Sequence, residues 1–483
     1  MEYPPQEAFS SAPQGTTASF GEATPASVTK LDDPPKFDLE SYIANYKGRT
    51  RFNRLYLIGI TSTYLSVDAL KAAISEAKSG KDVARYEKAV RALSEVAPGD
   101  HDATLDSAWV QQVQKGVKAE GDQLERELRG YKNNLIKESI RMGNEDMGNH
   151  YYETGDLVAA SKAYSRMRDY CTTPNHIASM LFKLINVGVE RGDWLSVTSN
   201  VQRLRNSQSK PEDLARNQAK ISAALGLAQM HGGFFRDAAT SFLSVKPTLG
   251  DTFNDIVTPN DIAVYGGLCA MASMDRTELQ TKVLDNVEFR NFLELEPHIR
   301  HAIKFFINSK FRPLLDILDN YRTDYLLDIH LHRHVADLYE KIRIKAIQQY
   351  LVPFSVVILD TMAAIFSPEV VGGEAHPASL KSPFVKELVR LIQEKVLDAR
   401  LDLEKGLLIV NEKDTRIEAQ EKILKDVRKF NEEMHLQILR ASVLQAGMEL
   451  RAPNQESTAR FGHVSAARRG LGGSQRGGPS GSK

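Results

Sequence analysis

The most informative hydrophobic pattern lies between residues 148 and 170, GNHYYETGDLVAASKAYSRMRDY. Gly148 and Tyr151 fall on one predicted helix, Gly155 interrupts it, and Ala160 and Tyr164 fall on the next. A small residue lets two helices approach closely, an aromatic side chain fills the groove beside it, and glycine supplies the turn. The segment therefore predicts one helical hairpin of a repeat, in which these five residues pack between helices.

The same pattern returns weakly further along the chain. The turn glycine is followed five and nine residues later by a small or apolar side chain: Val197 and Val201 after Gly192, and Ala238 and Phe242 after Gly233. The three turn glycines are 37 and 41 residues apart, within the range of paired-helix solenoids. We assign residues 37–247 to a right-handed, TPR-like helical-repeat array, in which residues 67–133 form two or three leading helices.

The segment that follows, residues 248–412, is predicted as a second domain. Residues 248–349 have apolar positions at three- and four-residue spacing, which indicates several antiparallel helices. Residues 350–412 predict a compact apolar helix over 354–366, an amphipathic helix over 384–396 and a two-stranded hairpin. Leu397, Ala399 and Leu401 alternate with charged residues in the first strand. Residues 407–410 form the second strand, after a turn at 404–406. Helices followed by a hairpin are typical of a winged helix.

Residues 413–450 contain no proline and no glycine before Gly447, and predict one long C-terminal helix. Its apolar positions recur every three or four residues, so they form a single stripe that needs a partner. The stripe consists of Ile423, Val427, Phe430, Met434, Ile438, Ala441, Leu444 and Met448.

Both ends of the chain have compositions unlike a folded domain. Residues 1–36 contain six prolines with many Ser, Thr and Gly residues, and residues 451–483 are basic and rich in Gly and Ser. We expect both segments to be disordered. The overall fold class is therefore all-α with a small β-hairpin, flanked by two disordered ends.

Composition and charge limit the partners and the cellular compartment that we expect for this chain. Lys plus Arg and Asp plus Glu each number 62, so no net charge draws the 483-residue chain toward nucleic acid or anionic lipid. Two cysteines, Cys171 and Cys269, exclude a disulfide framework and indicate a reducing compartment. The first ten residues show no signal peptide, and the apolar run 351–366 is too short to span a bilayer. We expect a soluble protein of the cytoplasm and nucleus.

A repeat array leading into a winged helix and a long final helix resembles the PCI family of proteasome lid, signalosome and initiation-factor subunits. Several segments are similar, more specifically, to the subunit-one family of the COP-9 signalosome: YKNNLIKESIRMGNEDMGNHYYETGDL (131–157), RDYC (168–171), GGLCAMASMDRTELQ (266–280), FLELEP (292–297) and VLDARLD (396–402). The resemblance covers roughly residues 37–450. Residues 367–382 depart from the family pattern as a predicted insertion.

The resemblance implies a non-catalytic scaffold subunit of the complex that removes Nedd8 from the cullins of cullin-RING ubiquitin ligases. It implies partners among the other PCI subunits, contact with the metalloprotease subunit and with cullin-RING ligases through the complex, and a hetero-oligomeric state. Winged helices in this family pack side by side, and C-terminal helices gather into a bundle. We therefore expect two partner interfaces: the C-terminal stripe, and the hairpin at Leu397, Ala399, Leu401, Leu407 and Ile409.

Motifs of catalysis or cofactor binding are not found in the sequence. His330 and His332 begin the zinc motif H-x-H-x7-S-x2-D, but Glu340 stands where the motif requires serine. His330 and His334 would share a helix face, without the carboxylate of an H-E-x-x-H site. We interpret these histidines as solvated or interface residues. No phosphate-binding glycine loop is present, and Cys171 is interpreted as a packed thiol, so we expect no enzyme activity, cofactor or metal.

Two other functions remain open from the sequence. A proteasome lid subunit has the same predicted architecture. Winged helices also bind DNA, but Lys386, Arg390 and Lys395 on the second helix are offset by Glu387 and Glu394. Because this surface is mixed in charge, the pattern favours protein contact over nucleic acid.

Overall fold

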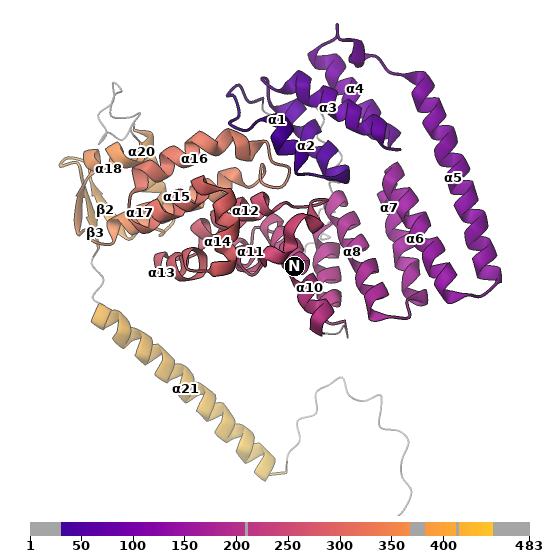
Figure 1. Cartoon of the computed structure of the whole chain (residues 1–483). Coiled ribbons are helices and arrows are strands. Elements are labelled where there is room, and N and C mark those ends of the chain that lie inside the picture. Colours follow the sequence, from indigo (N-terminus) through magenta and orange to yellow (C-terminus); the bar gives the residue numbers. More distant parts are fainter. Residues whose placement is uncertain (1–29, 208–210, 368–381, 412–414, 448–483) are drawn as a thin grey trace, which may run out of the picture. The chain divides into compact units, whose positions relative to one another are not determined.

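The computed structural model describes residues 30–207, 211–367, 382–411 and 415–447, and the following account is confined to them. The chain divides into two compact units, one ending at Val410 and one beginning at Asn411 (Figure 1). The first unit contains the helices and the sheet of the predicted array and winged helix. The second contains the predicted C-terminal helix.

Four helices near the N-terminus form a bundle with its own apolar core. They are α1 (Leu39–Ala44), α2 (Gly48–Thr61), α3 (Ser66–Ser79) and α4 (Val83–Val96). Leu55 and Ile58 of α2, Leu70 of α3 and Leu93 of α4 are fully buried in this core. Asp82 accepts a hydrogen bond from the Arg85 amide and so caps the start of α4.

Residues 30–36 pack against the first unit, contrary to the expected disorder of 1–36. Leu31 exchanges backbone hydrogen bonds with Thr61 and Thr63, at 2.8 and 3.0 Å. The Lys36 amide donates to Asp324 at 3.0 Å, and its ammonium lies 4.7 Å from the centre of the Tyr321 ring. The prediction was therefore wrong for these seven residues. Residues 1–29 lie outside the described part of the chain.

The array follows through a 27-residue helix, α5 (Ser107–Asn133), which packs beside the first repeat helix (Figure 1). Three helical hairpins come next: α6 (Lys137–Thr154) with α7 (Leu157–Arg166), α8 (Pro174–Arg191) with α9 (Trp194–Arg205), and α10 (Pro211–His231) with α11 (Phe235–Leu243). The turn glycines Gly155, Gly192 and Gly233 have φ of 95°, 67° and 77°. Because L side chains are strained in this region, glycine ends the first helix of each hairpin.

Helix α12 (Pro259–Ser273) is the centre of the next layer. It is apolar on all sides, and almost every residue from Asp261 to Ala272 is buried, as expected of a helix surrounded by others. Around it lie α13 (Arg276–Glu278), α14 (Val287–Leu295), α15 (Pro297–Ile307), α16 (Phe311–Leu326) and α17 (Val335–Leu351). The predicted helical part of the second domain is thus present, and its apolar core is continuous with that of the array.

The winged helix contains β1 (Val356–Ile358), α18 (Leu359–Phe366), α20 (Pro383–Gln393), β2 (Ala399–Asp402) and β3 (Leu407–Val410). The strands form an antiparallel sheet in the order β1-β3-β2. The predicted hairpin pairs Ala399 with Val410 and Asp402 with Leu407. The prediction of helix over all of 354–366 was wrong, because residues 356–358 form a third strand that pairs with β3.

The second unit consists, among its described residues, of helix α21 (Thr415–Gln445) (Figure 1). The prediction of one long helix is confirmed. The helix ends shortly before Gly447, whose φ of 69° is typical of a helix stop. Met448, the last predicted residue of the stripe, lies outside the described residues, as do residues 368–381 of the predicted insertion.

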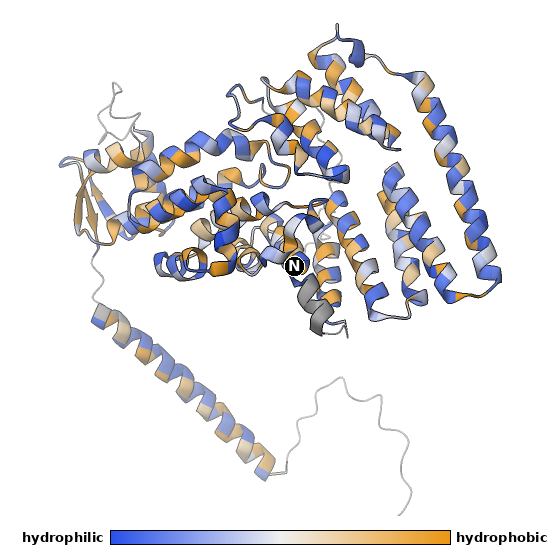
Figure 2. Cartoon of the chain, viewed as in Figure 1, coloured by the Kyte–Doolittle hydropathy of each residue, from blue (hydrophilic) through white to orange (hydrophobic). Residues whose placement is uncertain are grey.

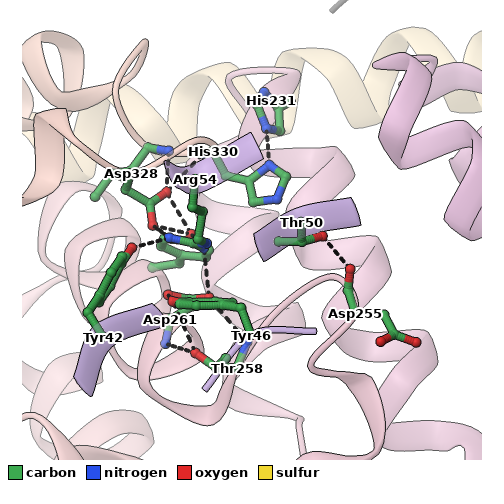
Figure 3. Close-up of polar contacts among 12 residues, drawn as sticks. Tyr42, Tyr46, Thr50, Arg54, His231, Asp255, Thr258, Asp261, Asp328 and His330 are labelled. Carbon is green, nitrogen blue, oxygen red and sulfur yellow. Dashed lines mark hydrogen bonds and ion pairs between the residues drawn. The ribbon is translucent and has the colours of Figure 1, made fainter. Parts of the chain in front are cut away.

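A buried arginine joins the N-terminal bundle to the helices around α12 (Figure 3). The guanidinium of Arg54, on α2, donates to Asp328 at 2.6 Å and to Asp261 at 2.9 Å. Tyr46 donates to Asp261 at 2.6 Å, and Tyr265 donates to Asp328 at 2.7 Å. Arg54 is fully buried, so one cation is matched by two carboxylates and fixed by two phenols.

The electrostatics of this network favour ionised Asp328. Burial raises the pKa of its carboxyl, but Arg54, His330 and the hydrogen bond from Tyr265 outweigh burial and lower the pKa to about 2. The apolar core of the bundle is separate from that of the remaining helices. Among the buried residues described in the bundle's core, Leu327 alone comes from outside the bundle helices and α5. The bundle is therefore held in place largely by polar contacts.

Replacing Arg54 with leucine is expected to lower the free energy of unfolding by about 3–5 kcal/mol, because two buried carboxylates lose their cation. The unpaired carboxyls would take up protons on folding, so the deficit should be larger at pH 7 than at pH 5. Urea denaturation at both pH values measures this. Arg126→Leu on the exposed face of α5 is the control; equal losses in the two variants would contradict the assignment.

Candidate protein-interaction surfaces

The repeat residues predicted from the sequence pack between helices. A Cβ on Gly148 would lie 2.5 Å from Cδ1 of Tyr164, so the ring of α7 rests directly on the backbone of α6. The Tyr164 hydroxyl donates to Asn149 at 2.8 Å. Ala160 is fully buried and Tyr151 half-buried. These residues set the spacing of the first hairpin.

The third hairpin repeats this contact. A Cβ on Gly226 of α10 would lie 2.9 Å from the ring of Phe242 on α11. The second hairpin uses Gly188 and Val197, with 2.8 Å between the corresponding atoms. Each hairpin therefore closes on a glycine of its first helix and a larger side chain of its second.

Gly148→Ala is expected to destabilise the chain by about 1–3 kcal/mol, because the added methyl group meets the Tyr164 ring. Gly116→Ala on α5 is the matched control, since nothing lies within 4 Å of a Cβ there. That control should stabilise the chain by about 0.5–1 kcal/mol, the ordinary gain of alanine in an exposed helix. Thermal unfolding of both variants compares them, and equal shifts would argue against close packing at Gly148.

The hairpin residues proposed as a partner interface divide between the two faces of the sheet. Leu397 and Ala399 are 5% and 6% exposed and belong to the chain's own core, and Leu401 packs against that core. The prediction that Leu397 and Ala399 contact a partner was therefore wrong. Alternation along a strand separates two faces, but it does not say which face the chain itself covers.

On the opposite face of the sheet, the residues of β1 and β3 are apolar and open to solvent. Strand register places Val356 of β1 opposite Ile409 of β3, and Ile358 opposite Leu407. Val356, Ile358 and Ile409 are 48%, 53% and 39% exposed, and Leu407 is half-buried. We call Val356, Ile358 and Ile409 the outer sheet face. Its β1 residues were not predicted as part of the sheet, because the sequence pattern assigned them to a helix.

Helix α21 carries apolar positions among polar ones along its length (Figure 2), and its predicted stripe is exposed. Ile423, Val427, Phe430, Ile438 and Leu444 are 57–64% exposed, and Met434 is 39% exposed. Ala441 is also exposed.

Four further apolar residues of α21, Ile417, Leu424, Leu436 and Leu439, were missed in the sequence and are all about half exposed or more. At 100° per residue, Ile417 and Leu424 lie beside the stripe, whereas Leu436 and Leu439 lie toward the opposite side of the helix. Exposed apolar residues therefore extend beyond the stripe, which is typical of a helix with more than one neighbour.

The histidines that resembled a zinc motif lie in a turn between α16 and α17, so His330 and His334 do not share a helix face. His330 is 3% exposed, which contradicts its interpretation as solvated. The ring of His231, at the end of α10, lies 3.4 Å from Nδ1 of His330 (Figure 3). It also lies 3.3 Å from Nε2 of His334. Burial lowers the pKa of His330 to about 3 and that of His231 further, so both rings are neutral at pH 7.

Neither metal geometry nor reactive thiols accompany these rings in the described residues. No three His, Cys, Asp or Glu side chains there are arranged to hold a metal ion. Burial raises the pKa of the Cys171 thiol, and raises that of Cys269 to about 12, so both stay protonated at neutral pH. Across the described helices, none combines the length and apolar character of a membrane span.

Two family models match the chain. The model of the 26S proteasome subunit RPN7 matches residues 106–282, which include α5 and the three hairpins. The PCI domain model matches residues 318–412, from α16 through the winged helix. A helical-repeat array followed by a winged helix, in the region that the PCI domain model matches, makes this chain a PCI-domain protein, a class built into multisubunit complexes.

Comparison with individual proteins shows to which family within this class the chain belongs. The chain is 63% identical over 426 residues to COP9 signalosome complex subunit 1 of Emericella nidulans, covering 88% of this chain and 86% of that relative. It is 44% identical over 360 residues to the protein of that name in Neurospora crassa, covering 74% and 81%. A 26S proteasome non-ATPase regulatory subunit 6 from Caenorhabditis elegans is 23% identical, covering 69% and 79%. The chain belongs to the COP9 signalosome subunit 1 family.

Proposed function

We propose that this chain is a non-catalytic scaffold subunit of the signalosome, and that the assembled complex removes Nedd8 from cullins of cullin-RING ligases. The exposed apolar surface of α21 is the observation that carries the scaffold role. A side chain of this kind gains about 1.5 kcal/mol or more when buried, and the stripe has seven described members. An isolated helix gains far less from its own propensity. We therefore expect helices of other subunits to bury this surface.

The outer sheet face is proposed as a second contact with a neighbouring PCI subunit. Two of its residues, Val356 and Ile358, lie on β1. This three-residue strand is at the edge of the sheet as described, so no further strand pairs with its outer side. Unpaired backbone donors and acceptors on an edge strand favour pairing with another chain. Ile358 and Ile409 would cover part of such a neighbour, while Arg400 and Asp402 on the same face would border it.

Catalysis is assigned to a separate metalloprotease subunit. The buried, neutral histidines and protonated thiols of this chain offer no activated nucleophile or general base, which supports a structural role. Access to cullin-RING ligases would come through the complex, in the cytoplasm and the nucleus. The higher identity to signalosome relatives favours this assembly over the proteasome lid.

Specific DNA binding is the less favoured alternative. In α20, Glu387 forms an ion pair with Arg343 at 2.8 Å, and Arg390 forms ion pairs with Glu340 and Glu394. Arg390 is thereby already partnered within the protein, which leaves less free positive charge for phosphate contacts.

Val427→Asp with Ile438→Asp is expected to exclude the chain from the reconstituted signalosome, because both charges would enter the helical contact. Removal of Nedd8 from cullin by the reconstitution mixture should fall as less of the variant enters the complex. The isolated wild-type chain, given the same Nedd8-modified cullin, should leave it modified. Native mass spectrometry measures incorporation into the complex, and a gel assay of the cullin measures removal of Nedd8.

The control for this experiment is Lys422→Asp with Lys429→Asp, which adds acidic residues to the polar face of α21. It should enter the complex normally. Full incorporation of the Val427 and Ile438 variant would refute α21 as the contact, and cleavage by the isolated chain would refute the non-catalytic role.

Ile358→Asp with Ile409→Asp is expected to weaken binding to the neighbouring PCI subunit, while changing the stability of the isolated chain by no more than about 0.5 kcal/mol. Leu408→Asp, on the buried face of the same strand, should instead unfold the winged helix. Pairwise pull-down with each PCI subunit and thermal unfolding separate the two effects. Unchanged pairing in the first variant would count against the outer sheet face.

A further inference from the structure

The two halves of α21 differ in how much charge they carry. Residues 416–433 contain ten Asp, Glu, Lys or Arg residues, whereas residues 434–445 contain one, Arg440. The predicted stripe runs through both halves, from Ile423 to Leu444. A surface helix keeps its charged residues on the side opposite the apolar stripe, whereas a helix that is apolar on more than one side is buried among neighbours. The change near residue 434 therefore indicates two different environments along one helix.

The side of α21 that faces away from the stripe changes from charged to apolar. Glu421 and Lys425 lie on this side in the first half, and both are exposed. Leu439 and Val443 follow them by 18 residues (439−421 and 443−425), which is five turns of an α-helix. They therefore lie on the same two lines along the helix as Glu421 and Lys425, and Leu436 lies beside them.

The apolar side chains on this side of α21 are open to solvent. Leu436 and Leu439 are 65% and 48% exposed, and Val443 is partly exposed. Their spacing of three and four residues is that of a helix face that packs against another helix. We call Leu436, Leu439 and Val443 the opposite strip.

A single neighbouring helix cannot cover both apolar sides of the second half. Ala441 of the stripe and Val443 of the opposite strip lie about 160° apart around the helix axis. A packed neighbour lies about 8–10 Å from the axis and covers a face of about 100°. Arg440, the one charged residue of this half, lies between the two apolar sides, where a long side chain can reach water. The second half therefore needs one helix on each side, and the first half needs one only.

The small size of the opposite strip limits what can cover it. At roughly 60–120 Å² for each side chain, its three residues would bury about 180–360 Å². A stable interface buries about 800 Å² on each partner, so the opposite strip cannot hold a dimer of this chain by itself. It suits a helix that other contacts already hold in place. In a multisubunit complex, such a helix belongs to a second subunit.

We propose that residues 434–444 of α21 are packed on two sides in the assembled signalosome, between amphipathic helices of two different subunits. One helix covers the stripe, and the other covers the opposite strip with its own apolar face. Residues 416–433 have a neighbour on the stripe alone, and their charged side faces water. This inference rests on the proposed role of α21 in assembly and adds the number of its neighbours in each half.

The first test is photo-crosslinking in the reconstituted signalosome. The crosslinking amino acid benzoylphenylalanine replaces Met434 of the stripe, Leu439 of the opposite strip or Glu421, one at a time, in the full chain. Illumination should link position 434 to one subunit and position 439 to a different one, which mass spectrometry of the linked peptides identifies. Position 421 lies on the same line as 439 in the first half, and its links should be at least tenfold fewer.

The second test is Leu439→Asp with Val443→Asp. This pair should lower incorporation of the chain into the complex at least tenfold at equal subunit concentrations, because two charges would enter the second helical contact. Glu421→Asp with Lys425→Asp places the same residues on the same lines in the first half and should assemble as wild type. Both variants should keep the Tm of the isolated chain, because none of the four residues belongs to its apolar cores as described. A lowered Tm for Leu439→Asp with Val443→Asp would place the opposite strip against this chain's own first unit and would overturn the proposal.

The results distinguish failure of this inference from failure of the proposed function. If the Val427 and Ile438 variant is excluded but Leu439→Asp with Val443→Asp assembles fully, α21 joins the complex through one apolar side and the inference is wrong. The inference is also wrong if position 439 links to the subunit that position 434 reaches, to a second copy of this chain, to this chain's own first unit, or to nothing. If neither Asp pair affects assembly, α21 is not the contact, and the proposed function loses its support as well.

Discussion

The position of the N-terminal bundle depends on one buried cation. Arg54 is surrounded by Asp261, Asp328 and three tyrosines, and it is the point at which a bundle with its own apolar core meets the helices around α12. A buried charge is tolerated only when paired and hydrogen-bonded, so the geometry of all these groups is tightly constrained. Apolar contact alone permits sliding between surfaces, whereas this network admits one register.

A second ionic cluster reinforces that register at the array. Arg49 of α2 pairs with Asp82 at 2.9 Å, and Arg85 of α4 pairs with Glu190 of α8 at 2.9 Å. Arg49 also donates to the Tyr152 carbonyl on α6 at 2.9 Å. The bundle thus contacts the first two hairpins at the ends of their first helices, and the array and bundle support each other. The outer sheet face is presented by this fixed framework.

Periodicity in the sequence predicted the helices, the three turn glycines and the β2–β3 pairing, because each depends on neighbours close in the chain. Strand β1 was missed, since three apolar residues before Leu359 continue the spacing of a helix and carry no turn signal. The alternation at Leu397–Asp402 identified two faces but assigned the core face to a partner. The Arg54 network left one hint, a charged residue within the apolar run RFNRLYLIGI, but its carboxylates are too distant in sequence to be predicted.

The sequence separation of Arg54 from its counter-ions has a consequence for biosynthesis. Asp261 and Asp328 follow Arg54 by 207 and 274 residues. At about 5–20 residues per second, a ribosome needs roughly 14–55 s to supply the second carboxylate. During that interval the nascent bundle must keep the guanidinium hydrated, so it cannot adopt its final closed arrangement. Completion of the N-terminal part is thereby delayed until the chain has been translated well past its midpoint, a window in which co-translational chaperones have access to it.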